Sequence, residues 1–258
     1  MVNMKIRFII AVFLTLYSQM VLSNSETEPK RVVVEHWPPW EIALDKKKEI
    51  VSGGLAVKLV EELMKRIEEP IVFVTVPWKR ALLEIKNGRS DLVPMVAKTE
   101  EREKYMIFTV PIYNDSILLA YSVNRLGSFR WDNWEDLKPY RFQLVRGYSY
   151  GREWNEAQSK YNYNISNSTN DAQSLKMLMH GRIDLTPLFF VNGTQLINDL
   201  EYSGLIKFAE KPIKETTFYF GISKKSQLAS RVDELNSAIT AMKEDGTFKE
   251  ILGTLYRN

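Results

Sequence analysis

The 258-residue sequence contains no cysteine and only two histidines, His36 and His180. The absence of cysteine excludes disulfides, thiolate metal sites and a lipid-modified cysteine. A serine–histidine–aspartate triad would have to use one of the two histidines, and neither a His-Glu-x-x-His motif nor a Walker phosphate-binding loop is present. We therefore expect no metal, no cofactor and no catalytic residues.

An excess of charge of one sign is also lacking, because 35 lysines and arginines nearly balance 32 aspartates and glutamates and leave a net charge of +3. No basic run, RNA-recognition pattern or zinc-finger spacing occurs, so nucleic acid is not an expected partner. Hydrophobic residues make up 45% of the chain, which is ordinary for a globular protein. The length is sufficient for one large domain or two modest ones.

The apolar run near the N-terminus, Phe8–Tyr17, is short. It follows Lys5 and Arg7 and precedes Ser23, a small residue after which cleavage would occur. These are the features of a secretory signal peptide, and the run is too short for a comfortable membrane span. We expect residues 1–23 to be a cleaved signal peptide and the mature protein to be periplasmic, with an uncleaved N-terminal anchor as the alternative.

Strand and helix patterns alternate in the part of the chain that follows. Arg31–Glu35 and Ile71–Val76 are short apolar runs typical of buried strands. Between them lies a helical segment with one apolar face, formed by Leu55, Leu59, Val60, Leu63, Met64 and Ile67. An alternation of strand, helix and strand favours parallel β-α-β units, so we predict an α/β fold.

The stretch Trp78–Tyr113 predicts a helix, a strand and a loop rich in ionisable groups. Apolar residues recur at helical spacing up to Gly88, which suits the C-terminal end of a helix. Asp91–Val96 is too short an apolar run for a helix and is expected to form a strand. Thr99–Arg102 then lie at the carboxyl end of that strand, where open α/β sheets hold their ligands. Arg102 is therefore the first candidate for a ligand contact.

Seven residues of this stretch follow the order of a known pattern: Gly88, Asp91, Thr99, Arg102, Phe108, Pro111 and Tyr113. The pattern resembles that of the family 3 extracytoplasmic solute-binding proteins, the bacterial amino-acid-binding type. The resemblance covers residues 30–258. It implies a two-domain periplasmic binding protein-like fold of type II, with a ligand cleft between domains joined by two hinge strands. Domain 1 would comprise residues 24–122 and 216–258, and domain 2 residues 123–215.

The resemblance also assigns ligand-binding roles. Arg102 would grip a carboxylate of the ligand, since the planar guanidinium fork matches a carboxylate bidentately. Trp37 and Trp78 would form aromatic walls in domain 1. The remaining residues with an expected role are Thr99 in domain 1, and Arg146, Tyr148, Ser149 and Phe189 in domain 2. The alternatives are core packing for the two tryptophans and, for Arg102, a surface ion pair with Glu100 or Glu103.

Two departures from the family pattern bear on the ligand. Pro94–Ala97 offer no side-chain donors where the family often carries serines. The family holds the ligand's ammonium with an aspartate five residues beyond the one matched by Asp184, and Phe189 stands at that position here. A buried ammonium without a counter-charge would cost several kcal/mol. We therefore expect a carboxylate-bearing or aromatic small molecule rather than an α-amino acid held in the standard way.

The expected function is the capture of a small ligand for uptake by an ABC-type permease of the inner membrane, by a protein that is a monomer and not an enzyme. One alternative is a sensory or accessory binding protein that presents its closed form to a receptor. Another is an enzyme on the same fold, similar to cyclohexadienyl dehydratases, in which Glu35 would serve as the acid.

Overall fold

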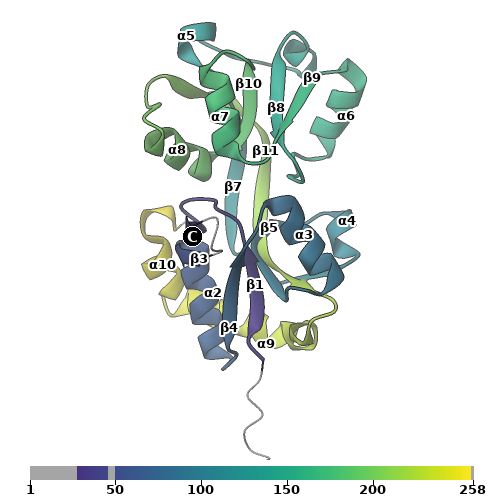
Figure 1. Ribbon diagram of the computed structural model, residues 1–258, viewed down its shortest axis with the longest axis vertical. Helices are drawn as coiled ribbons and strands as arrows, with labels where there is room; N and C mark the ends of the chain where they lie inside the picture. Colours follow the sequence, from purple (N-terminus) through teal and green to yellow (C-terminus); the bar gives the residue numbers. More distant parts are fainter. Residues whose placement is uncertain (1–27, 46–49, 257–258) are drawn as a thin grey trace, which may run out of the picture.

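The computed structural model describes residues 28–45 and 50–256, and it consists of two lobes connected by strands β7 and β11 (Figure 1). The predicted signal peptide, residues 1–23, lies outside the described residues. None of the helices in the described part of the chain combines the length and the apolarity that a membrane span requires.

The lower lobe of Figure 1 is built from the predicted parallel β-α-β units. Val32 of the first strand lies beside Phe73 on one side and Leu92 on the other, and both pairings are parallel. Its elements are β1 (Lys30–Val34), β2 (Ile42–Asp45), β3 (Ile50–Gly53), α2 (Leu55–Arg66), β4 (Ile71–Thr75), α3 (Trp78–Asn87), β5 (Leu92–Ala97), α4 (Glu100–Glu103) and β6 (Met106–Phe108). The prediction of the first three buried strands and two helices is thus confirmed, with ends that differ by one or two residues.

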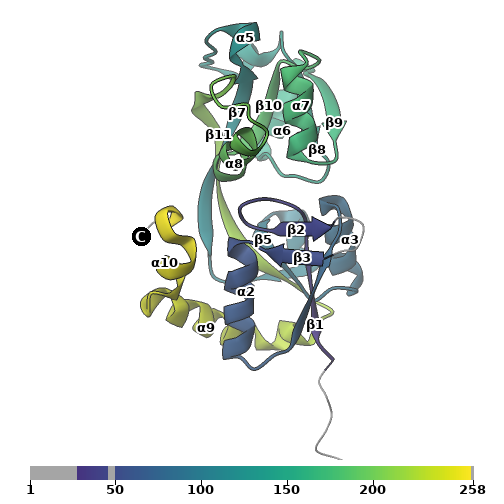
Figure 2. The ribbon, with the colours of Figure 1, turned by 60° about the vertical axis from the view of Figure 1, so that its left-hand side comes forward.

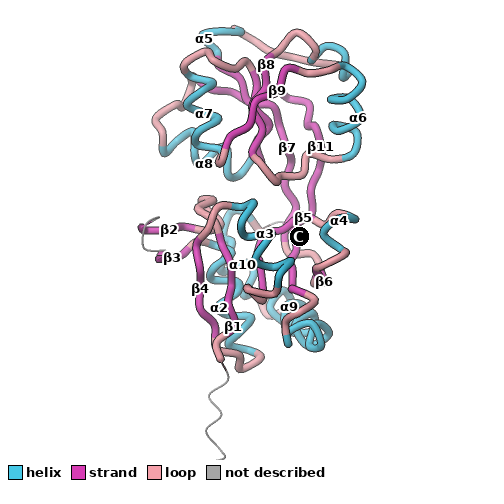
Figure 3. Tube along the Cα trace, turned by 45° about the vertical axis from the view of Figure 1, so that its right-hand side comes forward, coloured by secondary structure: helices cyan, strands magenta, loops and turns pink. Residues whose placement is uncertain are grey.

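The upper lobe repeats the arrangement with the parallel strands β8, β9 and β10 (Figure 3). Its elements are α5 (Val123–Leu126), η1 (Trp134–Leu137), β8 (Arg141–Val145), α6 (Arg152–Tyr161), β9 (Asn164–Ser168), α7 (Asp171–Met179), β10 (Leu185–Phe189) and α8 (Phe190–Asp199). The patterns did not predict β9 and α8. The sequence of β9, Asn-Ile-Ser-Asn-Ser, is mostly polar because this strand lies at the edge of the sheet.

Two long antiparallel strands, β7 (Tyr113–Ser122) and β11 (Ile206–Ser223), extend from one lobe to the other. The lower end of β11 pairs with β5, and the upper part of β7 pairs with β10. Within the described residues, nine strands therefore form one sheet that runs through both lobes. Asp115 and Thr216 face each other between these two regions. The predicted domain boundaries at residues 122/123 and 215/216 stay a prediction.

The C-terminal helices pack back on the lower lobe, as the resemblance implied. After η2 (Gln227–Arg231), helix α9 (Val232–Glu244) and helix α10 (Thr247–Leu252) lie against α2 (Figure 2), followed by η3 (Gly253–Leu255). Leu235, Ile239 and Phe248 share one buried cluster with the apolar face of α2. Arg66 of α2 also donates from Nη1 to Asp245 at 2.7 Å. The C-terminal segment thus completes the lower lobe, which also contains the N-terminal strand β1.

Candidate functional site

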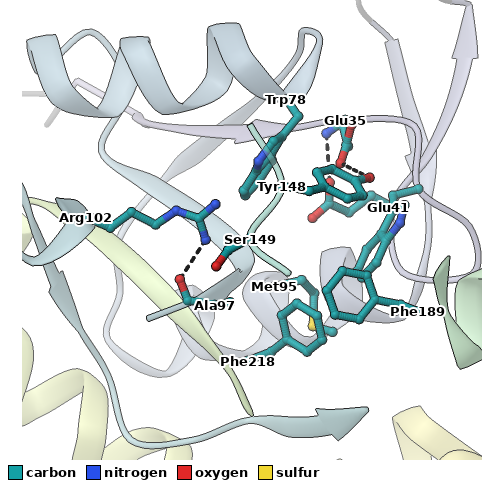
Figure 4. Close-up of a pocket in the computed structure, with 11 residues that line it drawn as sticks. Glu35, Glu41, Trp78, Met95, Ala97, Arg102, Tyr148, Ser149, Phe189 and Phe218 are labelled. Atoms are coloured by element: carbon teal, nitrogen blue, oxygen red, sulfur yellow. Dashed lines mark hydrogen bonds between the residues drawn. The ribbon is translucent and has the colours of Figure 1, made fainter. Parts of the chain in front are cut away.

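A cavity lies between the lobes, at the level where β5 ends and β8 turns into α6 (Figure 4). It is lined by Glu35, Trp37, Glu41, Trp78, Met95, Ala97, Arg102, Tyr148, Ser149, Phe189 and Phe218. Six of the eight residues predicted to bind the ligand are thus brought together, and their role as ligand contacts stays a prediction. The cavity has a volume of only about 20 Å³, so the side chains of both lobes nearly fill it.

Arg102 is placed by a short helix rather than by the predicted loop. The hydroxyl of Thr99 accepts a hydrogen bond from the backbone N–H of Arg102 at 3.2 Å, which caps helix α4. The guanidinium donates from Nη1 to the carbonyl of Ala97 at 2.7 Å and from Nη2 to the carbonyl of Gly147 at 2.9 Å. It also lies 5.4 Å from the centre of the Trp78 ring. These two bonds use two of its five N–H groups.

The burial of Arg102 argues against the surface ion pair considered as an alternative. Its residue exposure is 5%, and burial lowers the pKa of its guanidinium from the usual value. Glu103 instead forms a salt bridge with Lys98 at 2.8 Å. A buried guanidinium that faces a cavity is suited to receive a carboxylate, because a charge removed from water needs a partner of opposite charge.

Aromatic rings form the walls of the cavity. Trp78, at the start of α3, donates from Nε1 to the carbonyl of Gly147 at 2.9 Å. The ring of Trp37 lies 5.4 Å from that of Phe189 and 5.6 Å from that of Phe218. The ring of Tyr148 packs edge-on to Trp78 at 6.1 Å. Both tryptophans are buried and also line the cavity, so they have the packing role and the wall position at once.

The backbone is specialised at two points around the cavity. Gly147 has φ +88°, and a Cβ there would lie 3.1 Å from the Trp78 ring, so a side chain would crowd this wall. Met95 has φ +47°, and the register between β5 and β11 shifts beside it. This bulge brings Met95 into the lining of the cavity in the segment where serines are absent.

Three buried acidic residues lie at the end of the cavity away from Arg102. Glu35 follows β1, and its backbone N–H donates to Glu41 Oε2 at 2.7 Å. Asp171 is the first residue of α7, which Asn170 caps. The hydroxyl of Tyr148 lies 2.9 Å from Glu35 Oε1 and 3.3 Å from Asp171 Oδ2, and Trp37 Nε1 donates to Asp171 Oδ2 at 3.2 Å. These contacts join the two lobes.

The electrostatics of this acidic cluster (Glu35, Glu41 and Asp171) favour bound protons. Burial, followed by the proximity of Asp171, raises the pKa of Glu35 to about 8. Burial raises the pKa of Asp171 to about 7 and that of Glu41 well above its usual value. No lysine or arginine of the described residues offsets the burial of these carboxyls by an ion pair. The cluster is therefore short of positive charge.

Larger cavities adjoin the two ends. Beside Arg102, a cavity of about 670 Å³ is lined by basic and acidic side chains, with Thr99, Tyr148 and Ser149 among its walls. Beside the acidic cluster, a cavity of about 340 Å³ is lined by Glu35, Trp37, Tyr148 and Asp171 together with residues of β4 and α8. Tyr148 borders all three cavities. It therefore separates the arginine side of the cleft from the acidic side.

The remaining predicted residues take different positions. Thr99 lines the larger cavity beside Arg102 and caps α4. Arg146 is exposed and is not among the residues that line the three cavities. Sequence reasoning missed Glu41 and Asp171 as site residues. Asn170-Asp171 carries a helix-start signal, but the polar strand β9 before it was not recognised, so nothing placed Asp171 at a sheet edge.

The turn between β8 and α6 also spells Gly-x-Ser-x-Gly, from Gly147 to Gly151, a pattern found at the nucleophile of serine hydrolases. Such a serine needs a neighbouring base. No histidine is among the described residues that line the cavities with Ser149, and His36 Nδ1 accepts a hydrogen bond from the backbone of Ala43. Ser149 is therefore not arranged as a nucleophile. Likewise, in the part of the chain that the structure describes, no three or more histidine, aspartate or glutamate side chains, the acidic cluster included, are placed so that they could hold a metal ion together.

Comparisons with known proteins agree with this architecture. The model of the bacterial extracellular solute-binding proteins, family 3, matches residues 31–256. The L-cystine-binding protein TcyA of Bacillus subtilis (strain 168) is 26% identical over 205 residues, which cover 77% of this chain and 70% of TcyA. The ABC transporter arginine-binding protein 1 of Escherichia coli (strain K12) is 23% identical over 220 residues, covering 83% and 85% of the two chains.

Among solved structures, a histidine kinase sensor domain with similarity to periplasmic binding proteins aligns with a TM-score of 0.75 at 17% identity. The alignment covers 88% of this chain and 96% of that domain. This likeness confirms the predicted type II fold. The family match extends over nearly all of the described residues and over both lobes. The chain therefore belongs to the bacterial extracellular solute-binding proteins of family 3.

Proposed function

We propose that this solute-binding protein captures a carboxylate-bearing small molecule between its lobes, with Arg102 holding the carboxylate. The observation that carries the proposal is the buried guanidinium of Arg102, which faces the cavity with N–H groups to spare. Trp37, Trp78 and Phe189 supply flat apolar walls for the body of the ligand. Tyr148 and Ser149 come from the other lobe and complete the enclosure as the lobes close.

The ligand would then be delivered to an ABC-type permease. The two curated relatives support this role, since one is named as an L-cystine-binding protein and the other as an arginine-binding protein of an ABC transporter. Export by a cleaved signal peptide, a periplasmic location and a monomeric state complete the proposal. Presentation of the closed form to a receptor is the alternative, which the likeness to a histidine kinase sensor domain supports. Co-purification with a permease or with a receptor separates the two roles.

The protein binds its ligand without turnover in this proposal. One observation favours an enzyme as the second candidate: Glu35 faces the cavity with a pKa raised to about 8, so it carries a proton at neutral pH. A dehydratase acting on a cyclohexadienyl acid requires such an acid to protonate a leaving hydroxyl. Incubation of the protein with a cyclohexadienyl acid, followed by absorbance, tests this candidate. Turnover that is lost in Glu35→Gln would favour the enzyme.

The binding function is tested by a thermal-shift screen of amino acids, aromatic acids, dicarboxylates and small peptides. A ligand at about one hundred times its Kd raises the free energy of unfolding by roughly 2.7 kcal/mol. For a carboxylate-bearing hit, Arg102→Ala should weaken binding about 100-fold in calorimetry, because charge-assisted bonds are each worth about 1.5–3 kcal/mol. Arg130→Ala, which alters an exposed arginine on the upper lobe, is the matched control. Equal affinity in wild type and Arg102→Ala would show that Arg102 does not bind the carboxylate of the ligand.

A further inference from the structure

The segment Gly147-Tyr148 is held in the cleft as a bound molecule would be. At one end, the carbonyl of Gly147 accepts hydrogen bonds from Arg102 Nη2 and Trp78 Nε1, each at 2.9 Å. In the middle, the Tyr148 ring packs against Trp78 and Phe189 with centroid distances of 6.1 and 6.2 Å. At the other end, its hydroxyl contacts Glu35 and Asp171. The segment thus places an acceptor at the arginine and a donor at the acids.

The donor end is incompletely satisfied. A phenol carries one hydrogen, so the hydroxyl of Tyr148 donates to only one of the two carboxyls that it touches. Oδ1 of Asp171 has no hydrogen-bond partner among the described residues, although Asp171 is 98% buried, with an exposure of 2%. A native structure rarely leaves such an atom unpaired without a functional reason. The unpaired atom lies in a residue that lines the 340 Å³ cavity.

The charge at this end is also unbalanced. Glu35 and Asp171 come from different lobes, and both contact the hydroxyl of Tyr148. Glu41 adds a third carboxyl, which accepts a hydrogen bond from the backbone N–H of Glu35. The groups that contact the pair are the Trp37 indole, the Tyr148 hydroxyl and the backbone N–H of Trp78, and all three are neutral donors. A group with a positive charge and several N–H donors would satisfy both carboxyls at once, whereas the phenol does not.

We propose that Glu35 and Asp171 form a subsite for a positively charged group of the ligand, an ammonium or a guanidinium, and that Tyr148 fills this subsite until the ligand displaces it. This inference rests on the proposed function for the carboxylate at Arg102, and it adds a cation at the opposite end. The preferred ligands are zwitterions whose two charged groups are separated by an apolar or flat body. Phe189, which lacks a charge, packs beside that body.

Paired probes that differ only in the cation test the proposal by calorimetry. 4-(Aminomethyl)benzoate is compared with 4-ethylbenzoate, and 5-aminopentanoate with hexanoate; benzylamine serves as a cation without a carboxylate. Each probe is titrated into the wild-type protein and Tyr148→Ala. It is then titrated into Tyr148→Ala combined with Asp171→Asn, with Glu35→Gln or, as a control, with Asp132→Asn. Asp132 is an exposed carboxylate of the upper lobe that lines none of the three cavities. Circular dichroism establishes that each variant is folded.

The expected result is that Tyr148→Ala binds at least one amine probe about tenfold or more tightly than its uncharged counterpart, a difference of about one charge-assisted contact. Asp171→Asn and Glu35→Gln should abolish this preference, and Asp132→Asn should retain it. If Asp171→Asn does not fold, Glu35→Gln alone decides.

Equal binding of the paired probes overturns the proposal, as does the absence of amine binding to Tyr148→Ala. A preference that survives both acid substitutions overturns it as well. The proposed carboxylate function fails separately, when Arg102→Ala leaves the binding of 4-ethylbenzoate and hexanoate unchanged. Benzylamine binding that depends on Asp171 then still supports the cation subsite.

Discussion

The two ends of the cleft are built in different ways. At the arginine end, one helix cap and one strand end, all within Ala97–Arg102, fix the guanidinium before the other lobe contributes anything. At the acidic end, Glu35 and Asp171 are separated by more than a hundred residues and meet only when the lobes come together around Tyr148. The arginine end is thus formed by neighbouring residues of one lobe, whereas the acidic end is formed only when the two lobes close on each other. This difference determines which measurements each end should affect.

The largest expected effect comes from removing a buried aromatic side chain that also bonds to the acidic end. Trp37→Ala should lower the free energy of unfolding by about 3–5 kcal/mol, the usual cost of deleting a buried aromatic residue. Trp37 packs on Trp40, Phe189 and Phe218 and also bonds to Asp171. Denaturant unfolding measures the change. A loss below about 1 kcal/mol would mean that the tryptophan belongs to the ligand site and not to the core.

The pH dependence of stability should originate at the acidic end. Glu35 has a folded-state pKa of about 8 against an ordinary 4.5, and Asp171 one of about 7 against 3.8. At pH values between the ordinary and the raised pKa of each group, the folded protein binds more protons than the unfolded chain. The stability that these two carboxyls contribute is therefore fully present below about pH 4 and is lost as the pH rises towards 8. Thermal unfolding of the ligand-free protein from pH 4 to 9 should follow this trend, and Glu35→Gln should flatten it. A stability that increases over the same range would contradict the closed acidic cluster.

At the arginine end, the shape of the cation should matter as well as its charge. Arg102→Lys keeps a positive charge but loses the planar fork that bonds Ala97 and Gly147, so a carboxylate ligand should bind about tenfold more weakly. Calorimetry with the best hit of the screen measures this. Full affinity in the lysine variant would show that only the charge is used.

The smallest effect is expected from Tyr148→Phe, which removes one hydroxyl. The ligand-free protein should lose about 1 kcal/mol of stability, the net value of a typical hydrogen bond. Affinity for a cationic ligand should not decrease, because the phenylalanine competes less strongly for the acids. Tyr150→Phe is the control, since its hydroxyl accepts from the backbone of Val145 inside one lobe. Weaker ligand binding in Tyr148→Phe alone would assign the hydroxyl to ligand recognition.

The sequence predicted the arginine end well because its signals are local. Gly88, the short apolar run of β5 and the Thr99–Arg102 spacing follow one another closely in the sequence. Local backbone geometry is therefore sufficient to place Arg102 at the end of β5. The single error there, a loop in place of α4, arose because a four-residue helix has too little periodicity to be recognised.

The acidic end could not be predicted in the same way. Glu35 was considered only as an acid catalyst, and Asp171 follows a polar edge strand that lacks an apolar pattern. That these two residues meet depends on the pairing of β7 with β11 and on the closure of the lobes, which no local pattern describes. Charge balance in a buried cluster becomes visible only when the residues are placed in space.

The long strand β11 has a consequence for the order in which the protein folds. Its lower end pairs with β5 and β6, more than a hundred residues earlier in the chain, and the helices that cover α2 follow it. The upper lobe is nearly continuous in sequence, whereas the lower lobe stays incomplete until the last forty residues are available. Contacts of such long sequence separation slow folding. During synthesis the upper lobe can therefore form first, and a chain that ends before Thr216 would expose the edge of β5.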